Sequence, residues 1–219
     1  MKENKKRVEA ITLSSIMIAF AISISAICAV MPFLNLPFGG GFTIASMLPI
    51  IVIAYMYGTK WGLLTAFVYS IMQMLLGFNT VSAFFLPGDS QMLWYRAIIV
   101  CLIDYVIAYT VLGFGGIFRN KFGTRKALVL GSIFAISLRY IAHIVSGAIF
   151  FGTWAEWFFT QDGFPAWGEK ILEIFSGGSL ATVYSIIYNG TYMIPEIIIT
   201  AIVACFVTRI PQIKMRDEV

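Results

Sequence analysis

This sequence contains few charged residues. Only 12% of its 219 residues are Asp, Glu, Lys or Arg, about half the share that soluble globular domains carry. No charged residue occurs between positions 10 and 59 or between 61 and 88. So few charges cannot cover a compact fold in water, which excludes a soluble enzyme. Disorder is excluded as well, since it combines low hydrophobicity with high net charge. A polytopic membrane protein remains.

The chain also lacks the residue patterns of common catalytic and nucleotide sites. It contains no G-x-x-x-x-G-K-[ST] phosphate loop, no H-E-x-x-H and no G-x-S-x-G, so neither ATP hydrolysis nor the usual hydrolase chemistry is indicated. Its single histidine and its three cysteines, each in an apolar run, provide neither a metal cluster nor a disulfide framework. We therefore predict a protein that is not an enzyme and has no metal or cofactor.

The uncharged segments predict an all-α bundle of six transmembrane helices in one domain, 1–219. A helix needs about 20 residues to cross the hydrocarbon core. Prolines and glycines at 32–41 divide the longest uncharged segment into two spans and a loop. In lipid the backbone must satisfy its own hydrogen bonds, which favours helices. The expected spans are 10–31, 43–57, 61–78, 94–117, 126–152 and 180–208. An aromatic-rich outer loop is expected at 154–179, where it could cover a pocket.

The distribution of Lys and Arg predicts that both termini are cytoplasmic. With six spans the two ends lie on one side, and that side collects 12 of the 15 basic residues. The net charge of +4 follows from this topology, so no nucleic-acid partner is indicated. The first apolar run is long and lacks a clear Ala-x-Ala exit, so we expect a retained helix in the cell membrane rather than a cleaved signal.

Four ionisable residues stand out inside the predicted spans: Asp104, Arg139, His143 and Glu196. Such groups are costly in a bilayer and usually face a cavity or one another. One interpretation is an internal ion pair, for example Asp104 with Arg139. The alternative is an outer-leaflet cavity, because hydrogen-bonding and aromatic side chains accompany these groups, namely Tyr105, Tyr184, Tyr188 and Asn189. A carboxylate, an imidazole, tyrosine rings and an amide together suit a flat cation.

Small residues mark one face of the first span. Ser15 and Ala19 are four residues apart, and Ser23 extends the pattern, so another helix could pack closely against this face. Ordinary packing inside the bundle is the alternative, because small residues are common in membrane helices.

Two longer motifs are more specific. Residues 137–152 contain R-Y-x-x-H-x-x-S-G, and residues 184–196 contain Y-N-G-x-Y-x-x-P. With the segments 37–49 and 102–116, they closely resemble the ThiT family, the thiamine-specific S-components of energy-coupling factor (ECF) transporters. The resemblance extends over almost the whole chain, although the segment 154–179 is longer than expected.

The resemblance implies a set of thiamine-binding residues. The family's acidic residue and its following tyrosine fall on Asp104 and Tyr105, and its stacking histidine on His143. The other implied ligand contacts are Tyr69, Phe151, Tyr184 and Asn189. Phe151 stands where some members have tryptophan, and whether Trp154 stacks instead stays open. The loop before the second span, with glycines at 39–41, resembles the family's lid but has no tryptophan.

The resemblance also implies partners and a mechanism. Ser15 and Ala19 would dock on a transmembrane coupling subunit that two ATP-binding subunits drive. Thiamine would bind from outside, the S-component would tilt in the bilayer, and the coupling module would release the vitamin inward. Three alternatives stay open: an S-component for another vitamin or for a precursor such as hydroxymethylpyrimidine, a stand-alone facilitator, and an intramembrane enzyme that uses His143 and Asp104.

Overall fold

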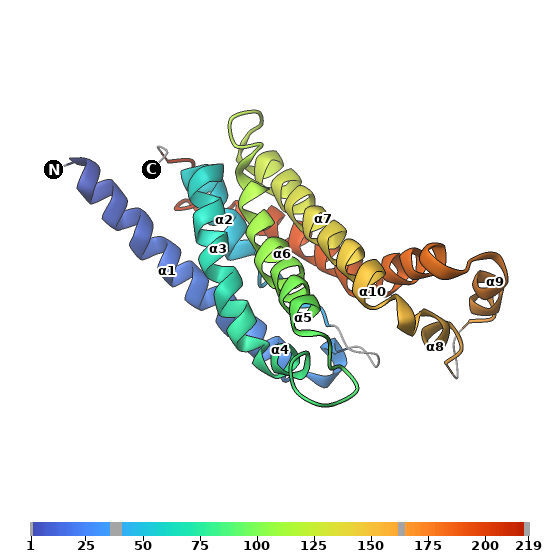
Figure 1. Cartoon of the computed structure of the whole chain (residues 1–219). Coiled ribbons are helices and arrows are strands. Elements are labelled where there is room, and N and C mark those ends of the chain that lie inside the picture. Colours follow the sequence, from blue (N-terminus) through green and yellow to red (C-terminus); the bar gives the residue numbers. More distant parts are fainter. Residues whose placement is uncertain (1, 36–40, 162–164, 217–219) are drawn as a thin grey trace.

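The structure, a computed structural model, describes residues 2–35, 41–161 and 165–216, and in these ranges its named elements are all helical (Figure 1). The helices are α1 (Lys2–Ala29), α2 (Leu48–Tyr57), α3 (Thr59–Leu76), α4 (Phe78–Ala83), α5 (Trp94–Cys101), α6 (Ala108–Thr110), α7 (Thr124–Phe150), α8 (Ala155–Phe159), α9 (Trp167–Ile174) and α10 (Gly177–Val207). Four tighter or wider turns join them: η1 (Pro32–Leu34), η2 (Leu102–Ile107), η3 (Val111–Gly116) and η4 (Gly152–Trp154).

Among the described residues, four helical stretches are long and apolar enough to cross a membrane. They cover Glu3–Ala29, Trp94–Gly116, Thr124–Phe150 and Gly177–Val207. A multi-pass membrane protein follows from these stretches. Each of the other two predicted spans also contains a helix, α2 with 10 residues and α3 with 18. The number of six membrane crossings therefore stays a prediction.

The second predicted span, 43–57, is wrong at its beginning, because α2 starts only at Leu48. Pro49 sits in the first turn, where a missing N–H costs nothing. The residues before it are irregular, and Ala45 has a φ of 57°, which no helix interior allows. At a rise of 1.5 Å per residue, α2 is roughly 15 Å long, about half of a bilayer core. All ten of its residues are buried by protein, which is where irregular backbone at membrane depth is tolerated.

The fourth span is continuous in space but changes its winding. It begins as α5, widens into the π-helical turn η2, passes through α6 and tightens into the 3₁₀ turn η3. A π turn inserts an extra residue into a helix and often occurs at a functional site. Here it contains Asp104 and Tyr105, two of the residues implied as ligand contacts.

The expected outer loop at 154–179 is wrong in its secondary structure. It contains the short helices α8 and α9, and α10 begins within it at Gly177. Aromatic packing explains why this segment has a defined structure. Phe158 and Phe159 are buried, and the centre of the Phe158 ring lies 5.4 Å from that of the Tyr184 ring in α10. The segment is therefore anchored on α10. Residues 162–164 lie outside the part of the chain that the structure describes.

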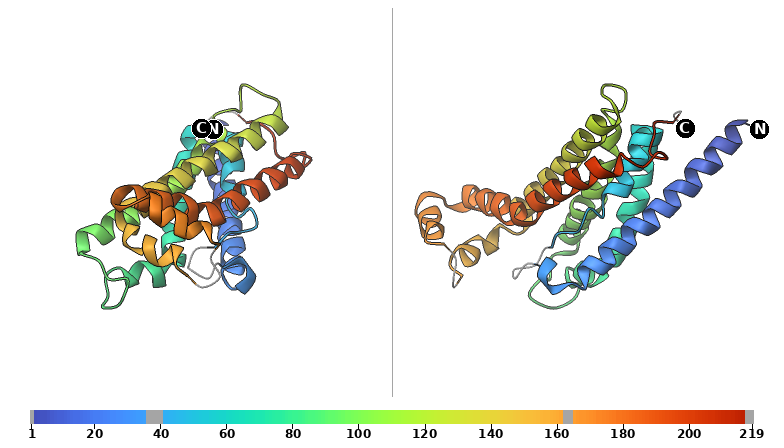
Figure 2. Two further views of the ribbon diagram at one scale, coloured as in Figure 1. Left: turned by 90° about the vertical axis from the view of Figure 1, so that its right-hand side faces the viewer. Right: turned by 180° about the vertical axis from the view of Figure 1, so that it is seen from behind.

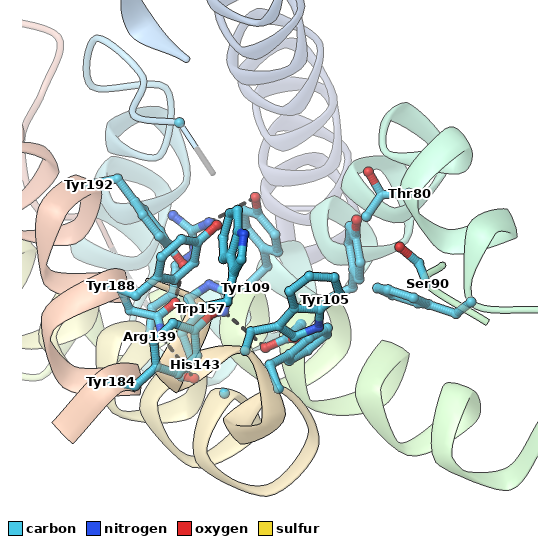
Figure 3. A pocket seen from close by; sticks show the side chains of 17 residues that line it. Thr80, Ser90, Tyr105, Tyr109, Arg139, His143, Trp157, Tyr184, Tyr188 and Tyr192 are labelled. Carbon is cyan, nitrogen blue, oxygen red and sulfur yellow. Dashed lines mark hydrogen bonds and ion pairs between the residues drawn. The ribbon is translucent and has the colours of Figure 1, made fainter. Parts of the chain in front are cut away.

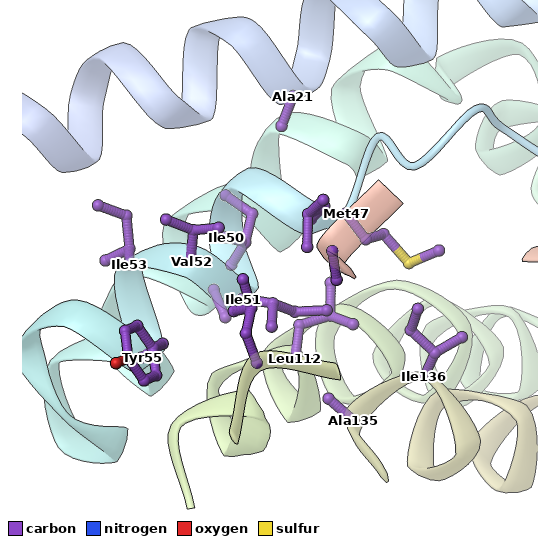
Figure 4. Close-up of a cluster of buried hydrophobic side chains, with 14 of the residues drawn as sticks. Ala21, Met47, Ile50, Ile51, Val52, Ile53, Tyr55, Leu112, Ala135 and Ile136 are labelled. Carbon is purple, nitrogen blue, oxygen red and sulfur yellow. The ribbon is translucent and has the colours of Figure 1, made fainter. Parts of the chain in front are cut away.

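Backbone contact between helices holds the centre of the bundle together. A Cβ atom added at Gly131 of α7 would lie 2.0 Å from the carbonyl oxygen of Gly115, and one at Gly116 would lie 2.2 Å from that of Ala54. Around these contacts, Ile50, Ile51, Leu112 and other side chains of α2, η3 and α7 form the main apolar core (Figure 4). On the other side, α7 and α10 pack against each other over a long interface (Figure 2).

The two termini lie at the same end of the bundle (Figures 1 and 2). The Arg216 amide donates a hydrogen bond of 2.8 Å to the Met56 carbonyl, and its guanidinium contacts Glu9 of α1 and the Tyr57 hydroxyl. The C-terminal segment thereby ties α1 to the end of α2. An even number of crossings is consistent with this arrangement.

The small-residue face of α1 points away from the bundle. Ser15, Ala19 and Ser23 are exposed, whereas Ala10 and Ala21 are completely buried against the core. Packing within this chain therefore does not account for the pattern, and the face is available to lipid or to another helix.

We expect Gly131→Ala to destabilise the protein. In an exposed helix this change stabilises by up to about 1 kcal/mol, but here the new methyl group meets backbone that cannot yield, and overpacking of this kind costs about 1–3 kcal/mol. Thermal unfolding in detergent measures the balance. Gly178→Ala, in the first turn of α10 with open space around it, is the matched control and should not lower the midpoint. An unchanged midpoint for Gly131→Ala would contradict the packing described.

Candidate ligand-binding site

A cavity of about 600 Å³ lies among α7, α10 and the η2–α6 turn, with η4 and α8 at its edge (Figure 3). This size is within the range of small-molecule sites. Polar and aromatic side chains dominate its wall. The lining residues are Gly41, Thr80, Phe84, Ser90, Asp104, Tyr105, Tyr109, Arg139, His143, Gly147, Phe151, Trp154, Trp157, Tyr184, Tyr188, Asn189 and Tyr192.

One carboxyl group lies in the wall, held between η2 and α7. An oxygen of Asp104 lies 3.0 Å from Nδ1 of His143, and the other accepts a hydrogen bond of 2.8 Å from the Ser146 hydroxyl. His143 and Ser146 are three residues apart and therefore share a face of α7. The side chains of Asp104 and His143 are 19% and 11% exposed, so both reach the cavity from a largely buried position. The carboxyl thus has a fixed direction.

The internal ion pair suggested for Asp104 and Arg139 is wrong. Asp104 is paired with His143, while Arg139 donates to the Tyr109 hydroxyl at 3.0 Å and to the Met47 sulfur at 3.1 Å. The guanidinium also lies 4.3 Å from the centre of the Tyr109 ring, within cation–π range. The two charges therefore occupy different parts of the wall.

Asn189 links α10 to α7. Its amide nitrogen donates to the Ser185 carbonyl at 2.8 Å and to the His143 carbonyl at 3.3 Å, and its side-chain oxygen accepts from the Tyr192 hydroxyl. Gly147 makes room for this contact, because a Cβ there would lie 3.1 Å from the amide nitrogen of Asn189. One lone pair of the Asn189 oxygen is left for a ligand.

Tyrosine rings form one side of the cavity. Tyr184, Tyr188 and Tyr192 are four residues apart on α10 and stand in a column (Figure 3). The rings of Tyr184 and Tyr188 are stacked at 5.5 Å, and that of Tyr192 stands edge-on to His143 at 6.1 Å. This wall offers both ring faces and hydroxyl groups.

Two tryptophan side chains lie at the rim of the cavity, one more than the sequence predicted. Phe151 and Trp154 both line it, as does Trp157, whose ring meets that of Trp154 edge-to-face at 5.6 Å. Phe151 is tilted against Phe84 at 6.1 Å. The glycines predicted for a lid lie at 39–41. Of these, Gly41 lines the cavity, while residues 36–40 lie outside the described residues.

The structure brings together six of the seven predicted ligand residues, namely Asp104, Tyr105, His143, Phe151, Tyr184 and Asn189. Tyr69 is the exception, since it is completely buried behind the wall and does not line the cavity. Its ring packs edge-on against Tyr109 at 5.5 Å, and its hydroxyl contacts Ser25 and Gln73. A direct contact of Tyr69 with a ligand therefore stays a prediction that the lining of this cavity does not support.

Sequence reasoning missed Tyr109, Tyr192 and Trp157 as lining residues. Helical spacing could have found the two tyrosines, since each lies four residues after a tyrosine already considered. Trp157 had no such signal, because the helix α8 was not predicted.

Comparison with known proteins supports a family relationship. The family model "Thiamine transporter protein (Thia_YuaJ)" matches residues 14–160. The chain is 31% identical over 217 residues to "Thiamine transporter ThiT" of Bacillus subtilis (strain 168), covering 94% of this chain and 92% of that protein. A solved structure of ThiT from Listeria monocytogenes has a similar fold, with a TM-score of 0.62 and 21% identity over 96% of this chain and 100% of that chain.

We expect Tyr69→Phe to lower stability without opening the cavity. Removing the hydroxyl leaves the buried Gln73 amide and the Ser25 hydroxyl with one partner fewer, which costs about 1–3 kcal/mol. Thermal unfolding is the measurement. Tyr95→Phe, at an exposed tyrosine of α5, is the control and should leave the midpoint unchanged. Equal midpoints for the two variants would contradict the supporting role.

Proposed function

Because this chain belongs to the thiamine transporter family, whose members are membrane transport proteins and not enzymes, we propose that its cavity binds thiamine. The observation that carries the proposal is the carboxyl of Asp104, oriented within a cavity walled by aromatic rings. Thiamine is a cation with two planar aromatic rings that are joined by a methylene group. A carboxylate offsets its positive charge, and ring faces attract and stack on it.

The proposed contacts divide the ligand between two sides of the cavity. Asp104 and Tyr105 would lie on the side of the positive ring, with His143 stacking nearby. On α10, Tyr184 would offer a ring face, and the free lone pair of Asn189 would accept from an amino group on a heterocycle. Three aromatic side chains are available to stack at the rim, namely Phe151, Trp154 and Trp157. The cavity therefore has indole rings at its rim even though position 151 is a phenylalanine. We propose that Arg139 lies away from the positive ring.

We expect Asp104→Asn and Asn189→Ala each to weaken thiamine binding at least tenfold, about 1.4 kcal/mol. The first change removes the negative charge, and the second removes the link between α10 and α7. Titration of tryptophan fluorescence on the purified protein measures the dissociation constant, since Trp154 and Trp157 line the cavity.

Glu173→Gln is the matched control, because it removes an exposed carboxyl of α9 that does not line the cavity. It should bind like the wild type. Unchanged affinity in both site variants would discard this pocket, and tighter binding of riboflavin, biotin or hydroxymethylpyrimidine would assign the cavity to another ligand.

We further propose that the chain is the substrate-binding subunit of an ECF importer. The exposed small-residue face of α1, with Ser15 and Ala19, fits close docking of a helix from a transmembrane coupling subunit. Two ATP-binding subunits would supply the energy, since the chain carries no phosphate loop of its own. Both termini would be cytoplasmic, because their end of the bundle carries most of the basic residues. Capture from outside, tilting and inward release would follow.

We expect the double variant Ser15→Leu/Ala19→Leu to bind thiamine normally but to fail in uptake. Bulky side chains would keep a partner helix from approaching the α1 backbone, while the cavity is not touched. Uptake of labelled thiamine by cells that express the chain with a coupling module, compared with binding by the purified variant, is the measurement. Val145→Phe, which adds bulk at an exposed position of α7, is the control and should transport. Full uptake by the α1 variant, or uptake without any ATPase, would refute coupling through this face.

A further inference from the structure

The irregular segment 41–47 connects the cavity to α2. Gly41 lines the cavity at one end, and Met47 precedes α2 at the other. Between them the backbone turns sharply: the Ala45 amide donates to the Thr43 carbonyl at 3.0 Å, and the hydroxyls of Thr43 and Ser46 are 2.7 Å apart. Ala45 has a positive φ, which is unfavourable for a residue with a Cβ. Such a turn persists only when its surroundings hold it.

Glu196 of α10 holds the middle of this segment. Its carboxyl accepts a hydrogen bond of 2.5 Å from the Thr43 amide and bonds of 2.9 and 3.0 Å from the Thr43 hydroxyl. The Thr200 hydroxyl, one turn further along α10, adds a weaker contact at 3.5 Å. Glu196 is only 2% exposed and does not line the cavity. Its contacts on the segment therefore serve the turn and not a ligand.

Arg139 holds the far end of the same segment while also lining the cavity. One guanidinium nitrogen donates to the sulfur of Met47, and another to the Tyr109 hydroxyl in the cavity wall. Two ionisable side chains, one from α10 and one from α7, thus converge on seven residues that are far from both in sequence.

We propose that Glu196 is a positioning residue for the ligand, which acts by fixing Thr43 and, through it, the place of Gly41 in the cavity wall. This inference rests on the proposed binding of thiamine in that cavity. A carboxyl at this depth in the membrane is costly, and apolar residues could fill the space at no such cost. A carboxylate accepts from the amide and the hydroxyl of Thr43 with both oxygens, whereas an amide in its place would turn an NH₂ donor toward these donors.

The test compares four single variants for thiamine affinity and for thermal stability without ligand. Glu196→Gln replaces one accepting oxygen by a donor that faces other donors. Thr43→Val removes the hydroxyl at nearly constant shape, and Thr43→Ser restores it. Thr200→Val is the matched control, because it removes the other hydroxyl on Glu196 without touching the segment 41–47.

We expect Glu196→Gln and Thr43→Val each to raise the dissociation constant about tenfold, and Thr43→Ser and Thr200→Val to bind like the wild type. In the double variant Glu196→Gln/Thr43→Val the two losses should not add, since both remove the same bond. If Glu196→Gln does not fold, the two Thr43 variants and Thr200→Val still decide the question.

Two results would overturn the proposal: wild-type affinity in Thr43→Val, or equal losses in Thr200→Val and Thr43→Val. The second would mean that Glu196 merely supports α10. Failure of the wild type itself to bind thiamine is a different result, which refutes the proposed function rather than the role of Glu196.

Discussion

A charged or strongly polar side chain below the membrane surface must find its partners inside the protein, and this constraint organises the described part of the bundle. The ionisable groups within the spans form such bonds across helices, although Nε of Arg139 and Nε2 of His143 have no hydrogen-bond partner in the described part of the chain. Asp104 bonds to His143 and Ser146, Arg139 to Tyr109 and Met47, and Glu196 to Thr43 and Thr200. Because most of these bonds join different elements, the groups that make the cavity polar also determine how the helices meet around it. An apolar core of side chains from α2, η3 and α7 lies beside the cavity and supports the helices that form its wall.

The positions of most long helices along the chain could be predicted from the uncharged segments, because length and hydropathy are the main requirements for a helix in lipid. What could not be predicted depends on distant partners. In the irregular turn at 43–47, Thr43 bonds to Glu196, which is 153 residues away in the sequence. The helix α8 packs its Phe158 ring against Tyr184 of α10, and no local sequence pattern predicts this contact. The number of membrane crossings, by contrast, follows from the sequence argument alone and stays a prediction.

The candidate site was predictable where its residues share a helix and unpredictable where they meet across helices. The pair of motifs around His143 and Asn189 led to the thiamine transporter family, which the comparisons confirm. Tyr69 is completely buried, packs edge-on against Tyr109 and lies apart from the lining residues, which neither composition nor resemblance reveals. In the same way, the partner of Asp104 became evident only when η2 and α7 were placed side by side. The coupling to an ATP-driven module rests on the exposed face of α1 and remains a proposal.

The π-helical turn at Leu102–Ile107 has a consequence for how related chains are compared. Two neighbours in this turn, Asp104 and Tyr105, both line the cavity. A shift of one position along the helix would move the carboxyl of Asp104 from its present place, while the hydropathy of the segment would hardly change. The rotational phase of this helix, rather than its hydropathy, therefore determines whether a related chain of the same fold presents a carboxyl group to a positively charged ligand.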